Sequence, residues 1–443
     1  MEPARLQYSQ IDESVASKRH PSKLFVEPTT RCNLRCEMCV KQTSDNSIID
    51  GDLSMDTFRE LIPAFPYLKA LILTGIGEPL LHPDLAKFIA LAKRHLPQNS
   101  WIGFQTNGHL LNRHQAESVI NAGIDRICLS IDAATSDLYR KLRIGGTVAK
   151  MEDTFNTINS VRSKMNKQNL EISIEFVLMR SNMHELPGVL AWAAKRGATF
   201  AIVSHVLAYR EILEPEVVYS PSTDVSWLFY QNWQSKAKQK GLDIKKYHQI
   251  RWRPRKNREE KNIVRFVEQM VSEAIDRGIP IDFRNLIVEG QNESQKVSEL
   301  FDVARQVAKE YNLDLELPAL RPRKDRICNF VEDGSAFVSW DGHVHPCYFL
   351  WHRYVCYQNK SRKYVMPKSF GDLSQHNILQ IWNSIDFASF RSEVVRYDYP
   401  FCSNCILRPC DLIRSENFES DCHTTTVPCG DCPWCLGLLR CLQ

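Results

Sequence analysis

Short apolar runs alternate with helical patterns over the first half of the chain, and this alternation restricts the possible folds more than any other feature. Helical spacing of apolar residues is clearest over residues 82–96, 112–122, 148–167 and 184–196. Strands that alternate with helices form parallel βα arrays, so the sequence predicts an α/β fold. Six strands are expected, the first beginning at Leu24 and the others spanning residues 70–74, 101–106, 126–131, 172–179 and 199–207.

Composition describes an ordinary folded protein rather than a disordered or membrane-spanning one. The chain has 443 residues, more than one typical domain, with 43% hydrophobic and 24% charged residues. A net charge of +4 is too small to indicate a nucleic-acid partner. The sequence has no apolar run long enough to span a membrane, and its first residues lack the apolar core of a secretory signal. We therefore expect a cytoplasmic protein. In that compartment the fifteen cysteines indicate metal ligation rather than disulfides.

Three cysteines follow the first expected strand on one loop, Cys32, Cys36 and Cys39, with the spacing CxxxCxxC. Three thiolates so close in sequence suit three irons of a 4Fe-4S cluster and leave the fourth iron open as a binding site. Structural zinc needs four protein ligands, so the triplet favours iron–sulfur over zinc or over three unrelated buried thiols. The carboxyl ends of the strands carry the active site in βα barrels, and this loop belongs there.

This spacing resembles that of the radical S-adenosylmethionine (SAM) enzymes, whose cores are partial barrels of six βα units. The resemblance implies a partial (β/α)6 barrel here. It also implies that the open iron binds the amino and carboxylate groups of SAM, and that an electron from the cluster splits the sulfonium to give a 5'-deoxyadenosyl radical. A ferredoxin or flavodoxin is the expected electron donor.

The same resemblance implies SAM contacts at the ends of four further strands. Each expected position has an ordinary alternative, since turns and helix caps use the same residue types. The positions are Gly75, Gly77 and Glu78 after the second strand, Asn107 after the third, Ser130 and Asp132 at the end of the fourth, and Arg180 and Asn182 in the fifth unit.

Eleven further cysteines lie from Cys328 onward, and eight of them fall between Cys402 and Cys441. Their spacing resembles the SPASM extension of radical SAM enzymes, which implies two auxiliary iron–sulfur clusters, although Arg414 stands where the family commonly has a cysteine. Zinc is the competing metal, and a zinc-stabilised binding protein is the alternative of another class. Cys356 and Cys435 are left as free thiols, and the expected ligands are Cys328, Cys347, Cys402, Cys405, Cys410, Cys422, Cys429, Cys432 and Cys441.

The chain divides into four expected regions: an N-terminal lead over 1–22, a radical SAM core over 23–210, an insertion over 211–325 and a SPASM domain over 326–443. Within the insertion we expect helices near 227–240, 263–277 and 297–311 and a strand over 279–288. Its basic segment 245–261 includes Tyr247 and Trp252, and a solvated loop is favoured there over a binding surface.

The motifs at 176–190, 337–350, 369–391 and 429–441 resemble the radical SAM/SPASM proteins proposed as maturases for tungsten-cofactor aldehyde oxidoreductases. This resemblance implies a metalloenzyme or its pterin-type cofactor as substrate. The alternative is a ribosomal precursor peptide, but the short segment before Leu24 leaves little room for a leader-binding module. No catalytic acid or base stands out. Tyr348 is a weak candidate at a position where some SPASM relatives carry a catalytic aspartate, so we do not expect a sulfatase-type maturase.

Overall fold

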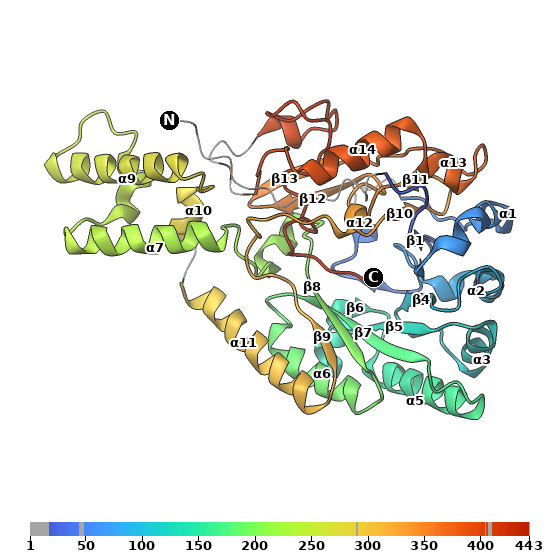
Figure 1. The fold of residues 1–443 in the computed structure, drawn as a ribbon. Helices are drawn as coiled ribbons and strands as arrows, with labels where there is room; N and C mark the ends of the chain where they lie inside the picture. Colours follow the sequence, from blue (N-terminus) through green and yellow to red (C-terminus); the bar gives the residue numbers. More distant parts are fainter. Residues whose placement is uncertain (1–16, 44–47, 289–290, 404, 406–409, 443) are drawn as a thin grey trace.

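The computed structural model describes residues 17–43, 48–288, 291–403, 405 and 410–442, and most of the expected N-terminal lead lies outside these ranges. Six parallel strands form the middle of one large sheet, and each pairs with the next in chain order (Figure 1). This arrangement confirms the predicted α/β fold. The strands are β1 (Lys23–Val26), β3 (Ala70–Leu73), β4 (Trp101–Thr106), β5 (Arg126–Ser130), β7 (Glu171–Leu178) and β8 (Phe200–His205).

Helices cover the outer face of this sheet, as the alternating sequence pattern predicts. The strand residues are mostly buried, and all four residues of β3 are, because a parallel sheet in such a fold is covered on both faces. The helices are α1 (Met55–Arg59), α2 (Leu85–Lys93), α3 (Arg113–Ala122), α4 (Ser136–Leu142), α5 (Val148–Lys164) and α6 (Leu186–Ala194).

Later parts of the chain extend the sheet at both edges. At one edge, β9 (Asp314–Glu316) pairs in parallel with β8. At the other, β10 (Ser335–Val338) pairs in parallel with β1, and β11 (Val344–His345) follows antiparallel to β10. The C-terminal region is therefore hydrogen-bonded directly to the strand that leads into the cysteine triplet.

The expected insertion contains two different structures. Four helices form a separate lobe with its own apolar core, whereas α11 (Gln291–Glu310) packs along α6 and leads into β9 (Figure 1). We therefore propose a narrower insertion, over 224–288. Its helices are α7 (Asp224–Gln239), α8 (Tyr247–Ile250), α9 (Arg258–Asp276) and α10 (Phe283–Val288).

The strand expected over 279–288 is wrong, because α10 occupies most of that range. Phe283 and Leu286, three residues apart, are both buried in the core of the lobe. Phe283 contacts the rings of Tyr230 and Tyr247 edge-on, at centroid distances of 5.8 and 5.4 Å. This spacing places both side chains on one face of a helix, so tertiary packing overrides the β-branched composition.

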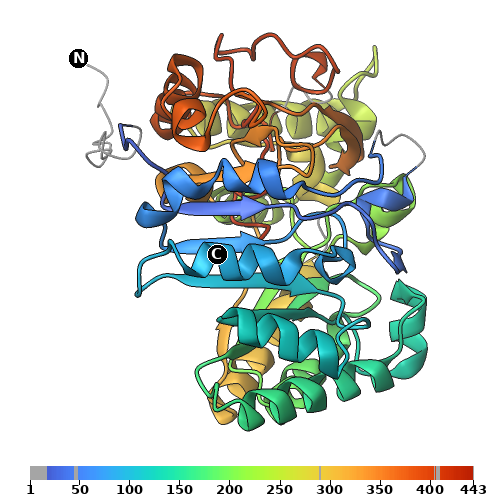
Figure 2. The ribbon, with the colours of Figure 1, turned by 90° about the vertical axis from the view of Figure 1, so that its right-hand side faces the viewer.

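The C-terminal region combines a few short elements with long irregular segments. Its helices are α12 (Asn329–Glu332), α13 (Ile378–Trp382) and α14 (Ile385–Arg396), and a hairpin joins β12 (Tyr354–Gln358) to β13 (Ser361–Val365). Figure 2 shows this region stacked on the β1 edge of the sheet. Among the helices in the described ranges, none is both long and apolar enough to cross a membrane.

Candidate active site

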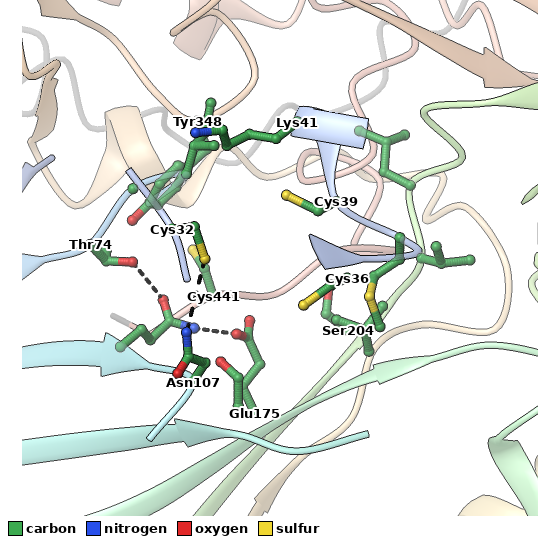
Figure 3. A pocket seen from close by; sticks show the side chains of 18 of the residues that line it. Cys32, Cys36, Cys39, Lys41, Thr74, Asn107, Glu175, Ser204, Tyr348 and Cys441 are labelled. Atoms are coloured by element: carbon green, nitrogen blue, oxygen red, sulfur yellow. Dashed lines mark hydrogen bonds between the residues drawn. The ribbon is translucent and has the colours of Figure 1, made fainter. Parts of the chain in front are cut away.

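The carboxyl ends of the parallel strands open into a cavity of about 310 Å³. Cys32, Cys36 and Cys39 line it, and their sulfur atoms face the same space in Figure 3. The short strand β2 (Arg35–Cys36) pairs with β6 (Arg143–Ile144), which fixes the middle of the cysteine loop. The structure thus brings the predicted triplet together at the predicted end of the sheet.

Burial opposes ionisation of these three thiols. It raises the pKa of Cys32 and of Cys36, and it raises the pKa of Cys39 to about 12. Metal ions reverse this tendency, because a thiol that coordinates a metal releases its proton and binds as the thiolate. The loop is therefore suited to cysteines that are ligands rather than free nucleophiles.

The expected glycine-rich loop, Gly75 to Glu78, lies against the cysteine loop in a space that requires glycine. A Cβ atom on Gly77 would lie 2.2 Å from the carbonyl oxygen of Thr29, and one on Gly75 would lie 2.3 Å from Cγ of Glu27. The amide of Glu78 donates to the carbonyl of Arg31 at 2.7 Å. Both glycines are therefore explained by close packing of two loops that line the same cavity.

Glu78 ties the loops after β3 and β4 together. Its carboxylate accepts hydrogen bonds from the amides of Leu80 (3.1 Å) and Asn107 (2.7 Å) and from the hydroxyl of Thr106 (2.6 Å). Burial raises its pKa to about 7, although these donors oppose the shift. The side-chain amide of Asn107 in turn donates to Asn33 at 2.9 Å and lies 3.9 Å from Sγ of Cys32.

Ser130 lines the cavity as expected, but Asp132 does not. Asp132 is fully buried, accepts a hydrogen bond from the amide of Val177 at 2.8 Å, and lies 2.6 Å from Nε of Arg143. It is the guanidinium of Arg143 that lines the cavity, 3.9 Å from Sγ of Cys36. The sequence analysis missed Arg143, whose signal was an arginine two residues before a glycine pair, directly after α4.

Arg180 and Asn182 are also kept away from the cavity by hydrogen bonds within the protein. Arg180 donates to the carbonyl of Pro215 at 2.6 Å and to that of Val217 at 3.2 Å. Asn182 is buried and donates to the carbonyl of Asp132 at 3.0 Å. Both side chains, which were expected to face SAM, instead use their hydrogen-bond donors to hold backbone segments in place.

A second acid, Glu175, was not predicted and lies on the floor of the cavity (Figure 3). Gln105 donates from Nε2 to its carboxylate and accepts a hydrogen bond from the hydroxyl of Thr74 at 3.1 Å. Burial, followed by the nearby charge of Asp132, raises the pKa of Glu175 to about 7. The missed signal was an acid in the interior of a mostly apolar strand.

Nine of the eleven C-terminal cysteines fall into two groups, and the two others are Cys356 in β12 and Cys441. Cys422 interacts electrostatically with Cys405 and with Cys410. Cys402 adjoins them along the backbone, where its carbonyl accepts a hydrogen bond from the amide of Cys405, whereas its Sγ lies against Gly430. In the described part of the chain, no three Cys, His, Asp or Glu side chains converge tightly enough for a single metal ion. The other group surrounds a small apolar cavity and consists of Cys328, Cys347, Cys429, Cys432 and Cys435.

Two expectations for individual cysteines change. Cys435, expected to be a free thiol, lies within the second group, and its hydrogen bonds to Cys328 and Cys432 raise its pKa. Cys441, expected to be an auxiliary ligand, lines the first cavity beside the triplet. Residues 436–438 form a turn next to Arg323. Cys441 therefore lies apart from Cys429, Cys432 and Cys435, the first three cysteines of its motif.

Two family models match the chain and together cover more than half of it. The model of the radical SAM superfamily matches residues 26–193, and that of the SPASM iron–sulfur cluster-binding domain matches residues 328–406. The chain therefore belongs to the radical SAM enzymes that carry a SPASM domain. This confirms the predicted family, with its 4Fe-4S cluster, SAM and auxiliary iron–sulfur clusters as cofactors, and favours it over the zinc-stabilised binding protein.

One relative is similar over nearly its whole length. The tungsten-containing aldehyde ferredoxin oxidoreductase cofactor-modifying protein of Pyrococcus furiosus is 25% identical to this chain, over 94% of this chain's length and 96% of its own length. The pre-heme d1 synthase of Dinoroseobacter shibae is 30% identical, but over only 40% of this chain and 42% of its own. Streptococcus suis SuiB bound to S-adenosylmethionine has the same fold, with a TM-score of 0.50 and 13% identity over 92% of this chain and 77% of its own.

Proposed function

We propose that this radical SAM enzyme is a maturase that modifies a metalloenzyme or its cofactor. The observation that carries the proposal is the similarity to the cofactor-modifying protein, which extends through both domains and the region between them. The partial relatives match only about two fifths of the chain, so they support the SAM chemistry without indicating a substrate.

We assign the SAM-binding cluster to Cys32, Cys36 and Cys39. The three thiols face one cavity and leave space beside them, as a cluster with one open iron requires. When bound there, the cluster supplies the electron that cleaves SAM. The protein holds the loop rigid through Thr29 and Thr30, whose hydroxyls donate to the carbonyls of Gly51 and Ile49 at 2.9 and 2.7 Å.

SAM itself would lie along the loop from Gly75 to Glu78, with Asn107 and Ser130 as further polar contacts. We assign its carboxylate to Arg143, a buried cation beside Cys36 whose position is fixed by Asp132. Asp132, Arg180 and Asn182 then act on the shape of the site rather than by contact with SAM. Glu175 remains on the cavity floor as an acid available to SAM or to the substrate.

We assign the second group of cysteines to one auxiliary cluster and the set Cys402, Cys405, Cys410 and Cys422 to another. The second group offers five thiols for four ligand positions, with Cys435 replacing the expected Cys441. The indole of Trp434 lines both the active cavity and the cavity of this group. The two cavities therefore adjoin each other at Trp434, and an auxiliary cluster held by these cysteines would supply an electron acceptor beside the active cavity.

The substrate and the electron donor are the further parts of the proposal. A folded oxidoreductase or its isolated cofactor is the preferred substrate, and a ferredoxin or flavodoxin is the preferred donor. The peptide alternative has a weaker basis, because the similarity to SuiB bound to its precursor peptide SuiA is at 13% identity and concerns the fold alone.

The test is an anaerobic assay of 5'-deoxyadenosine with deuterated candidate substrates. The protein should form 5'-deoxyadenosine from SAM in the presence of a reductant, and deuterium should arrive in it from an oxidoreductase or its cofactor. Label from a short precursor peptide, with none from the oxidoreductase, would establish the peptide alternative instead.

A further inference from the structure

Glu27, a residue outside the cysteine triplet and the glycine-rich loop, holds the loop from Gly75 to Glu78 that we assign to SAM. It directly follows β1 and is fully buried. Its Oε1 accepts a hydrogen bond from the amide of Ile76 at 2.9 Å, in the middle of the glycine-rich loop. A buried carboxylate that accepts from a loop amide fixes that loop, because a lost acceptor would leave the amide without a partner.

The other oxygen of Glu27 is held by the SPASM domain. Nε2 of His352 lies 2.9 Å from Oε2, and the amide of Trp340 donates to the same oxygen at 3.3 Å. The tautomer of His352 that carries its proton on Nε2 would donate to this oxygen. One side chain thus joins residues more than three hundred positions apart in the sequence.

We propose that Glu27 and His352 are a positioning pair through which the SPASM domain holds the SAM-binding loop in its active shape. The proposal rests on the assignment of that loop to SAM. His352 follows Trp351, which lines the active cavity, and lies on the same segment as Cys347 of the second group. The packing of the auxiliary domain therefore acts directly on the SAM site, beyond any role in electron transfer.

Two isosteric substitutions of His352 separate a hydrogen bond from general packing. In His352→Gln the side-chain amide nitrogen takes the place of Nε2, whereas in His352→Asn it takes the place of Nδ1 and cannot reach Glu27. His343→Asn is the matched control, since His343 is in the same domain and lies near Ser369 instead, at 3.2 Å. The measurement is the initial rate of 5'-deoxyadenosine formation against SAM concentration, with iron content determined for each variant.

We expect His352→Asn to raise KM for SAM about tenfold, the effect of losing one hydrogen bond to a buried carboxylate, and Glu27→Ala, which loses three hydrogen bonds, to raise it at least as much. The kcat and iron content of both variants should stay near those of the wild type. His352→Gln and His343→Asn should stay within about twofold, since each retains the hydrogen bond at issue. An unchanged KM in His352→Asn, or equal effects of Asn and Gln, would overturn the proposal.

If His352→Asn does not fold, Glu27→Gln compared with Glu27→Ala decides the question, because glutamine keeps an acceptor for the amide of Ile76. Glu27→Gln should then raise KM for SAM less than Glu27→Ala does, and equal KM values for these two variants would overturn the proposal. A wild-type protein that forms no 5'-deoxyadenosine would instead contradict the proposed function.

Discussion

The two main cysteine sites differ in what surrounds them. The triplet lies on a loop at the end of a regular sheet, beside a cavity of about 310 Å³ lined by acids, amides and Arg143. The second group lies among irregular segments, with Phe330, Phe349 and Val394 closing a much smaller space. A cluster that binds SAM needs room and polar contacts. A cluster that only exchanges electrons needs neither, and apolar side chains around it limit the solvent exposure and hydrogen bonds that set its reduction potential.

The largest expected effect comes from removing the triplet. Changing Cys32, Cys36 and Cys39 to alanine should abolish 5'-deoxyadenosine formation and remove about four of about twelve irons, one cubane of three by analogy with the family. Iron and sulfide analysis beside the SAM assay checks this. The matched change at Cys429, Cys432 and Cys435 should also remove one cluster but leave SAM cleavage detectable. Equal loss of SAM cleavage in both variants would erase the difference between the sites.

Arg143→Met should be next in size. It removes the cation assigned to the SAM carboxylate and leaves Asp132 buried without its partner, so the loss includes an unpaired charge. We expect SAM binding, measured by equilibrium dialysis, to weaken roughly a hundredfold. A lysine at this position should restore only part of the affinity, because it cannot reproduce the guanidinium geometry. Wild-type affinity in Arg143→Met would place the carboxylate elsewhere.

We assign Cys435 in place of Cys441 as an auxiliary-cluster ligand, and we therefore expect opposite results for the serine variants of these two residues. Cys435→Ser should change the electron paramagnetic resonance (EPR) spectrum of one auxiliary cluster, or remove that cluster, because its thiol lies within the second group. Cys441→Ser should retain the full iron content, because Cys441 faces the first cavity. Iron lost from Cys441→Ser but not from Cys435→Ser would restore the ligand set expected from the sequence.

The smallest expected effect is a pH dependence of SAM affinity. The pKa of Glu175 is about 7, so its carboxylate ionises as pH rises through neutrality. The ionised form attracts the positively charged sulfonium, so SAM should bind about tenfold more tightly at pH 8 than at pH 6. Glu175→Gln should flatten this dependence. Glu78 titrates in the same range, with a pKa of about 7, so an unchanged slope in Glu175→Gln would assign the effect to Glu78.

Local pattern was enough to predict the strands, the triplet and the glycine-rich loop, because each depends on residues that are close in sequence. The pairing of β10 with β1 was missed because a strand of four residues has too little pattern to reveal a partner at the far end of the chain. The interaction of Glu27 with His352 was missed for the same reason.

The roles of Asp132 and Cys441 could not be predicted because they depend on orientation rather than on sequence position. Asp132 has the expected place at a strand end, but its carboxylate turns inward to Arg143. Cys441 belongs to a run of cysteines, yet the turn before it sends it to another cavity. Spacing predicts which residues are near one another, and the tertiary fold decides which of them face the ligand.

The difference between the two cysteine sites is tested most directly by EPR of the reduced protein with and without SAM. Addition of SAM should change the signal of one cluster in the wild type, and the same addition should leave the spectrum of the variant without Cys32, Cys36 and Cys39 unchanged. A SAM-dependent change that persists in that variant would show that SAM binds at a different cluster and would contradict the assignment of the active site.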